Sequence, residues 1–249
     1  VNAFPKGFRL NIASENTWKG LLDAMRQVAG NMGGALEPNF KEGLPNIYCG
    51  VFTIELAFLF LIAKEVKLRD KLCSVFLLLF FMLSFIIRQL DYIWHGFHFP
   101  NMIPYRFSFL FSFVLLYMAY RAWLLRSRFP VWHIWAAAFF TAALLCCSKD
   151  ALETQSAELF GVTMNFHVYL IYNFGFLLAF TAALLYGTRT VKLPEEPEEA
   201  DLYRARFLRS CFRVHSRRAV LTLVVLEMGC NLLSFGLYFP GTGVSNYPK

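Results

Sequence analysis

The chain has 249 residues, of which 57% are hydrophobic and only 16% are charged, and Phe alone occurs 28 times. A soluble domain carries about a quarter of charged residues, so this composition excludes an ordinary soluble protein and predicts an integral membrane protein. The net charge of +7 does not indicate nucleic acid as a partner, because cations in a membrane protein gather at membrane boundaries and determine topology.

Residues 1–43 precede the first long apolar run. Between Glu15 and Met32 the apolar side chains recur with a helical period, and two glycines, Gly33 and Gly34, follow. We therefore expect an amphipathic helix in an extracytoplasmic segment. It either lies along the membrane surface or packs against neighbouring extracytoplasmic structure.

A helix needs about 20 mostly apolar residues to cross about 30 Å of hydrocarbon. Six segments of the chain are apolar over about this length. Each is expected to be helical, because lipid offers no partner to the polar groups of an isolated backbone. The predicted fold class is therefore an all-α integral membrane protein with about six transmembrane helices in the region 44–239. The ranges are 44–63, 71–88, 106–125, 131–148, 165–186 and 219–239. Residues 240–249 begin a further extracytoplasmic segment.

Lys and Arg are distributed unevenly over the connectors. The connectors after the first, third and fifth spans carry four, three and eight of them, whereas the others carry only Arg88, Arg106 and Lys149. Because cytoplasmic loops collect cations, the first group is predicted to be cytoplasmic and the 88–106 connector extracytoplasmic. The cytoplasmic basic loop 187–218 combines an acidic, Pro-rich linker with an Arg-rich helix, which either anchors the topology or rests on anionic lipid headgroups.

The 88–106 connector is unusual because it places charged, aromatic and histidine side chains between two apolar runs. Arginines at its two ends can make bidentate contacts to a lipid phosphate, and its aromatic rings offer stacking faces to a sugar. Its histidines and Asp91 can form hydrogen bonds or transfer protons, so Asp91 is a weak catalytic candidate. The substrate-binding candidates are Arg88, Trp94, His95, His98, Asn101, Tyr105 and Arg106.

Two other interpretations of this connector stay open. Asp91, His95 and His98 follow the spacing D-x3-H-x2-H, which suits a divalent cation, but the spacing is loose and no nearby Cys or Glu completes a site. We therefore assign no metal ligands and no certain cofactor. Alternatively, the connector is an interfacial aromatic belt, with Pro100 and Pro104 shaping the return of the chain into the membrane.

Polar residues also occur inside the predicted spans. Glu55 lies in the first span, and Glu227 and Asn231 lie one helical turn apart in the last. Acidic residues at membrane depth usually face the interior of the bundle or a cavity. These residues either line a functional pathway or form interhelical hydrogen bonds that fix the packing.

Several short motifs follow one another along the chain. They are WHGF at 94–97, PN at 100–101, PYR at 104–106 and FSFLFSF at 107–113. Together they resemble the bacterial membrane protein YfhO family. The segment LPNIYCG at 44–50 and the Glu227-x-x-x-Asn231 pair support the resemblance, which covers approximately residues 44–239.

The resemblance implies a GT-C-type glycosyltransferase, here a GT-C-like bundle fragment, in the bacterial cell membrane. Such an enzyme transfers a sugar from a polyprenyl-phosphate donor to a cell-envelope polymer such as lipoteichoic acid, on the outer face. Its catalytic acid is expected in a first outer loop, upstream of Val1, so we expect the chain to be an internal fragment. The implied partners are the lipid-linked sugar, the polymer acceptor and membrane lipids.

Two functions of other classes remain alternatives at this point. The first is a transporter or flippase of lipid intermediates, with Glu55 and Glu227 lining its pathway. Spans interrupted by Gly or Pro in two related halves of the chain would favour it. The second is a non-catalytic scaffold of an envelope synthesis complex.

Overall fold

The computed structural model describes residues 45, 47–97, 105–147, 157–159, 162–164, 166–189 and 198–238, a few of them by their backbone only. In this part of the chain the fold is helical, as predicted, apart from one short antiparallel hairpin that pairs Ala157 with Met164. The elements are α2 (Val51–Ile62), α3 (Leu68–Ile86), α4 (Arg88–Trp94), α5 (Ser108–Leu125), η1 (Arg126–Arg128), α6 (Val131–Cys147), β1 (Ala157–Leu159), β2 (Val162–Met164), α8 (Phe166–Gly187) and α9 (Glu199–Tyr238).

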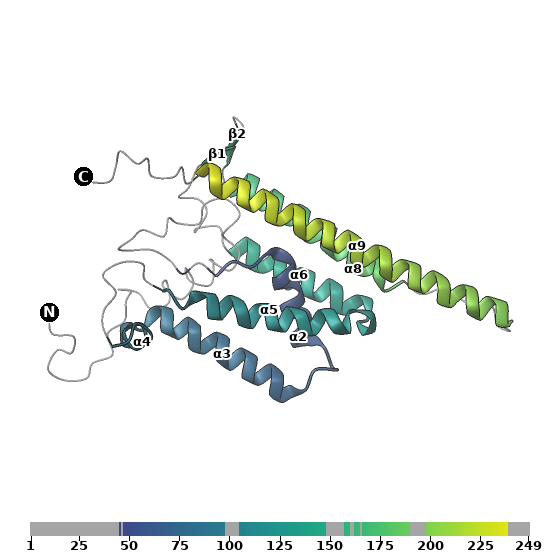
Figure 1. The fold of residues 1–249 in the computed structure, drawn as a ribbon, viewed down its shortest axis with the longest axis horizontal. Helices are drawn as coiled ribbons and strands as arrows, with labels where there is room; N and C mark the ends of the chain where they lie inside the picture. The colour runs from purple at the N-terminus through teal and green to yellow at the C-terminus, as the bar shows by residue number, and fades with distance from the viewer. Residues whose placement is uncertain are drawn as a thin grey trace.

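The helices form a bundle in which the chain runs back and forth between two ends (Figure 1). The C-terminal ends of α2, α5 and α8 lie at one end of the bundle, and the C-terminal ends of α3 and α6 lie at the other. Helix α2 packs against α5, α6 and α8, while α3 packs on α5 and α9 on α8. The cation-rich connectors, which are predicted to be cytoplasmic, are therefore all at the same end of the bundle.

Helix α2 lies in the centre of the bundle. Leu59 and Phe60 are completely buried, and Phe52 stacks on Phe180 of α8 with 4.6 Å between the ring centroids. Met118 of α5 and Ile134 of α6 complete the core from other sides. With only 12 residues, α2 is enclosed by longer helices.

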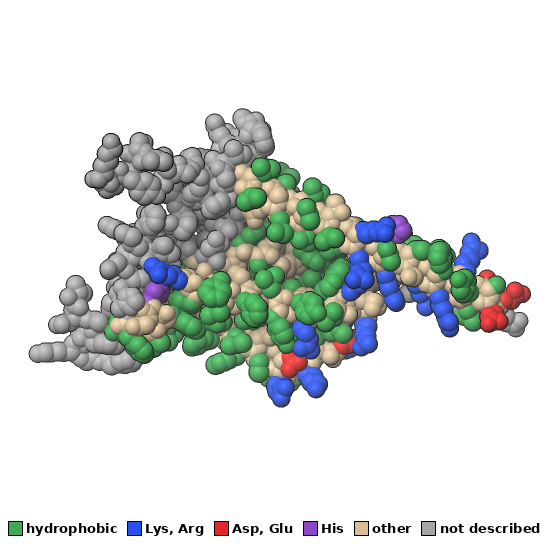
Figure 2. All heavy atoms as spheres, viewed as in Figure 1, with side chains coloured by type: hydrophobic (Ala, Val, Ile, Leu, Met, Phe, Trp, Pro, Cys, Tyr) green, Lys and Arg blue, Asp and Glu red, His purple; other side chains and the backbone are tan. Residues whose placement is uncertain are grey.

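The outward faces of the bundle are apolar. Phe139 is 69% exposed and Ile171 is 72% exposed, and large apolar side chains on α3, α5 and α9 are exposed in the same way. Figure 2 shows hydrophobic side chains over the visible flank of the bundle, with most Lys and Arg side chains toward one end and along the projecting helix. An apolar surface of this extent is typical of a protein that faces lipid.

Two helices are long and apolar enough to cross a membrane by length and composition, Ser108–Arg128 and Leu170–Gly187. The helices Val51–Ile62 and Val131–Cys147 are apolar but shorter. Each of the six predicted spans overlaps one helix. That the other four helices, α2, α3, α6 and α9, cross the membrane stays a prediction.

The first predicted span, 44–63, is not helical over its whole length. Residues 47–50 have no regular structure, and the helix begins at Val51. Part of the cause is local: Pro45 lacks a backbone N–H, and Gly50 adopts a φ of +97°, which L side chains rarely take. A side chain of another helix satisfies part of this irregular backbone, since Ser112 Oγ donates a hydrogen bond to the carbonyl of Ile47 at 3.1 Å.

Two other boundaries differ from expectation. The connector 88–106 was predicted as a loop, but the chain turns at Ile87 and residues Arg88–Trp94 form helix α4. The Arg-rich helix, predicted to be cytoplasmic, and the last predicted span are one continuous helix, Glu199–Tyr238. At 1.5 Å per residue this helix is about 60 Å long, about twice the thickness of the hydrocarbon, so part of it must project. Figure 1 shows that projection. The predicted helix between Glu15 and Met32, and residues 240–249, lie outside the described residues.

Candidate functional site

Asp91 of helix α4 and His95, the residue that follows this helix, form a pair four residues apart. His95 Nδ1 lies 3.2 Å from Asp91 Oδ1 and 2.8 Å from the backbone oxygen of Asp91. Because a carbonyl oxygen can only accept, Nδ1 carries the proton and donates it to these oxygens. In that tautomer the lone pair of the ring lies on Nε2, an atom that is buried from solvent. Both side chains are largely buried, at 6% and 14% exposure for His95 and Asp91.

A layer of aromatic rings lies beneath this pair. Trp94 stacks on Phe107 with 5.0 Å between centroids and an angle of 17° between the planes, and Phe107 stacks in turn on Phe85 at 5.2 Å. The rings of His95 and Tyr105 meet the same layer edge to face, at 6.5 Å from Phe107 and 5.8 Å from Phe85. Helices α3, α4 and α5 each contribute to this layer, so it fixes the orientation of α4 on the bundle.

The backbone next to this layer is strained. Gly96 and Phe97, which follow α4, have φ of +69° and +63°, and Tyr105, which precedes α5, has φ of +62°. Phe97 and Tyr105 are the only non-glycine residues in the described ranges with positive φ. Such a conformation costs about 1–3 kcal/mol per residue and is concentrated at functional sites. The strain therefore favours a functional interpretation of this end of the bundle.

A groove of about 350 Å³ runs along the seam between α3 and α5 on the outside of the bundle. Its lining is mostly apolar and includes Leu77, Phe81, Leu110 and Phe113. Phe81 also contacts Trp94, with 5.8 Å between the ring centroids. The groove therefore leads from the lipid-facing flank toward the aromatic layer.

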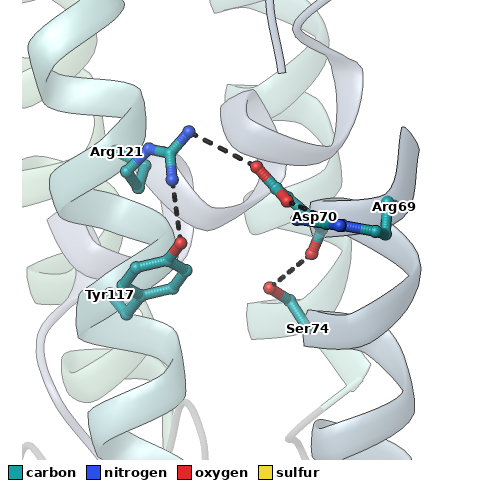
Figure 3. Close-up of polar contacts among 5 residues, drawn as sticks. All are labelled: Arg69, Asp70, Ser74, Tyr117 and Arg121. Atoms are coloured by element: carbon teal, nitrogen blue, oxygen red, sulfur yellow. Dashed lines mark hydrogen bonds and ion pairs between the residues drawn. The ribbon is translucent and has the colours of Figure 1, made fainter. Parts of the chain in front are cut away.

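Polar side chains lie at the other end of the groove, where Asp70, Ser74 and Tyr117 belong to its lining. Figure 3 shows the contacts around them. Arg121 of α5 reaches across to Asp70 of α3, with Nη2 at 3.5 Å from Oδ2, and its Nη1 donates to the hydroxyl of Tyr117 at 2.8 Å. Ser74 Oγ donates to the backbone oxygen of Asp70 at 2.8 Å, and the Arg69 guanidinium stands 3.9 Å from the Asp70 carboxylate. These contacts hold α3 and α5 together at the end of the bundle away from α4.

A second polar group lies inside the bundle, around Glu227 of α9. Glu227 Oε1 accepts two hydrogen bonds at 2.7 Å, one from the hydroxyl of Tyr48 and one from the backbone N–H of Val51. Val51 is the first residue of α2, where the N–H has no partner within its own helix. The buried carboxyl group of Glu227 therefore caps α2 from a position 176 residues further along the chain.

Glu55 forms a separate contact one turn into α2. Its side chain is completely buried, and its Oε1 accepts a hydrogen bond of 2.9 Å from Thr181 Oγ1 of α8. Its Oε2 has no hydrogen-bond partner among the described residues. The same Thr181 hydroxyl also donates to the carbonyl of Leu177 in its own helix. Its one proton is therefore shared between Glu55 and the backbone of α8.

The model of the family described as bacterial membrane protein YfhO matches residues 2–237 of this sequence. That range covers nearly the entire chain, including the motifs at 94–113 and both interior acids. The chain belongs to the YfhO family. The resemblance noted for those motifs is thus confirmed, and the family and the apolar helices together place the protein in a membrane. No curated protein and no solved structure matches the sequence.

The structure brings part of the predicted YfhO site together. Asp91, Trp94, His95 and Tyr105 all lie on or beside the aromatic layer. Arg106 is exposed directly after Tyr105. The remaining predictions are untested by the structure, because His98 and Asn101 lie outside the described residues and Arg88 is described by its backbone only. The convergence of Arg88 and Arg106 on one phosphate therefore stays a prediction.

The described residues contain no group of three or more His, Cys, Asp or Glu side chains able to hold a metal ion. His98 lies outside the described residues, so a metal site that uses it stays untested. Sequence reasoning missed the partners of the interior acids, Tyr48 for Glu227 and Thr181 for Glu55. No local pattern marks them, because each pair is far apart in the sequence. Asn231 is half-buried on α9.

Proposed function

We propose that this YfhO protein is a membrane glycosyltransferase of the GT-C type. It transfers a sugar from a polyprenyl-phosphate donor to a cell-envelope polymer, such as lipoteichoic acid, on the outer face of the membrane. One observation carries the proposal. The Asp91–His95 pair sits on an aromatic layer at one end of the bundle, and an apolar groove on the lipid-facing flank leads to that layer.

The arrangement suits a donor that is half lipid and half sugar phosphate. The isoprenoid chain would occupy the groove between α3 and α5, where Phe81 links the groove to Trp94. Arg106, exposed two residues before α5, would contact the phosphate. Trp94 and Tyr105 offer ring faces to the sugar, and Trp94 is 37% exposed.

The chemistry follows from these roles. An acceptor hydroxyl attacks the anomeric carbon of the sugar while the bond from that carbon to the phosphate oxygen breaks. The departing polyprenyl phosphate takes the electron pair, and the guanidinium of Arg106 stabilises the negative charge that develops on it. The proton of the hydroxyl passes to a base. His95, oriented by Asp91, is the candidate base within the described residues.

The test is glycosylation of the envelope polymer in cells that carry the full-length protein with Arg106→Ala. The matched control is Arg128→Ala, because Arg128 is also an exposed arginine beside a helix end, at the opposite end of the bundle. We expect Arg106→Ala to abolish glycosylation and Arg128→Ala to preserve it, with both proteins present in the membrane at wild-type levels. Normal glycosylation in the Arg106 variant would refute the role assigned to this residue.

A second candidate, a flippase or transporter of lipid intermediates, is favoured by the interruption of the first predicted span at Gly50. Transporters often place the N-terminus of such a broken helix at the substrate site. Here, however, the N-terminus of α2 faces Glu227, which belongs to the protein itself. Liposomes that contain the protein and a fluorescent polyprenyl-phosphate hexose would distinguish the two. A flippase moves the lipid across the bilayer unchanged, whereas a transferase removes its sugar.

A further inference from the structure

A polar pocket of about 350 Å³ lies at the opposite end of the bundle from the candidate site, where α9 leaves the other helices. Three elements enclose it: the turn η1 that follows α5, the C-terminal end of α8 at Gly187, and α9. Its polar lining consists of Arg126, Ser127, Ser210, Arg213, Ser216 and Arg217. Ser210, Arg213 and Arg217 are spaced three and four residues apart, so they lie on one face of α9.

The three arginines of the pocket bring positive charge that the described part of the protein does not neutralise. The charged neighbours of Arg126 are Arg213 and Arg217, both positive. None of the three forms an ion pair with an acidic side chain within the described ranges. The C-terminal end of α8 supplies about half a negative charge, far less than the three guanidinium groups bring. The pocket is therefore suited to an anion.

The walls of the pocket are held in place. Arg126 Nη1 donates to the backbone oxygen of Trp123 at 2.8 Å, and its guanidinium carbon lies 4.1 Å from the centroid of the Trp123 ring. On the other side, Ser216 Oγ donates to the carbonyl of Ala183 at 2.7 Å. A Cβ on Gly187 would lie 2.6 Å from Ser216 Oγ, so α8 and α9 are in close contact here. An anion would meet groups that are already oriented, which lowers the cost of binding.

We infer that this pocket binds a phosphate group. A guanidinium group presents paired N–H donors that match two oxygens of a phosphate, and the hydroxyls of Ser127 and Ser210 add further donors. The phosphate can belong to the headgroup of an anionic lipid or to a soluble phosphate compound. The predicted cytoplasmic position of the pocket brings it close to anionic headgroups. This inference does not depend on the proposed transferase activity, because the pocket lies at the other end of the bundle.

The test measures binding of three probes to the full chain purified in a non-ionic detergent. The probes are phosphatidylglycerol, phosphatidylcholine and inorganic pyrophosphate, with native mass spectrometry for the lipids and calorimetry for pyrophosphate. The test variant is R213Q/R217Q. Its matched control, R204Q/R218Q, removes the same charge from exposed arginines of the same helix that do not line the pocket. Melting without any probe verifies that both variants fold.

We expect wild-type protein to prefer phosphatidylglycerol over phosphatidylcholine, to bind pyrophosphate, or both. In either case R213Q/R217Q should bind the preferred probe about tenfold or more weakly, since each arginine removed eliminates a charge-assisted hydrogen bond. The control variant R204Q/R218Q should bind the same probe with an affinity within about twofold of wild type. Preference for the lipid alone assigns the phosphate to a headgroup, and pyrophosphate binding assigns it to a soluble compound. Equal losses in both variants, or no anion binding by wild type, would overturn the inference.

Discussion

Removal of the Glu227 carboxyl group should destabilise the bundle more than any other single change to its interior polar groups. One oxygen, Oε1, accepts from both the Tyr48 hydroxyl and the Val51 N–H, each at 2.7 Å. Glu227→Ala leaves two donors without a partner, one of them completely buried. An unsatisfied buried donor costs about 1–3 kcal/mol, so the two together should lower the free energy of unfolding by roughly 2–6 kcal/mol.

Glu227→Gln is the matched variant, because its amide keeps one carbonyl oxygen that can accept both hydrogen bonds. It should cost less than Glu227→Ala, because both donors keep an acceptor. The assay is unfolding by sodium dodecyl sulfate in mixed micelles, followed by circular dichroism. Wild-type stability in Glu227→Ala, or equal losses for Ala and Gln, would refute the capping role.

Three further changes test the packing around the central helix. Gly50→Ala should destabilise the protein by about 1–3 kcal/mol, because a φ of +97° strains any residue with a Cβ; a Gly175→Ala variant, which has open space around it, is the control. Gly187→Ala should lower the melting temperature by several degrees, because the new Cβ would stand 2.6 Å from a serine oxygen of α9. Thr181→Val should cost about 1–3 kcal/mol in the same unfolding assay, because it removes the hydroxyl that donates to Glu55. A Thr181→Ser variant that is as unstable as the valine variant would contradict that explanation.

The helices could be predicted from the sequence because apolar length and charge distribution are local properties. Each predicted span overlaps a helix, and the cation-rich connectors lie at one end of the bundle. The aromatic layer was predictable in part, since Asp91, Trp94 and His95 recur at helical spacing. Their helix was nevertheless interpreted as a loop, because Arg88 and Asp91 reduced the apolar character of a short segment. Only the packing of Trp94 on Phe107 shows why it is helical.

Contacts between residues far apart in the chain could not be predicted from the sequence. The helix of the first span begins late because Gly50 has a positive φ and because Glu227 offers the new N-terminus an acceptor. Glycine and proline near a span edge indicate a possible break, but they do not say which distant side chain stabilises it. The same holds for the phosphate pocket, in which Arg126 meets Arg213 and Arg217 only because α5 ends beside α9.

The most direct test of the proposed activity compares two histidines in proteoliposomes that contain the full-length protein and a radiolabelled polyprenyl-phosphate hexose. His95 and His215 each have Nδ1 at 2.8 Å from the backbone oxygen of the residue four positions earlier, but they lie at opposite ends of the bundle. We predict that wild type and His215→Ala transfer the label from lipid to polymer acceptor, and that His95→Ala is slower by about 10²–10⁴-fold. Label that crosses the bilayer still attached to its lipid, or equal transfer by both variants, would contradict the account.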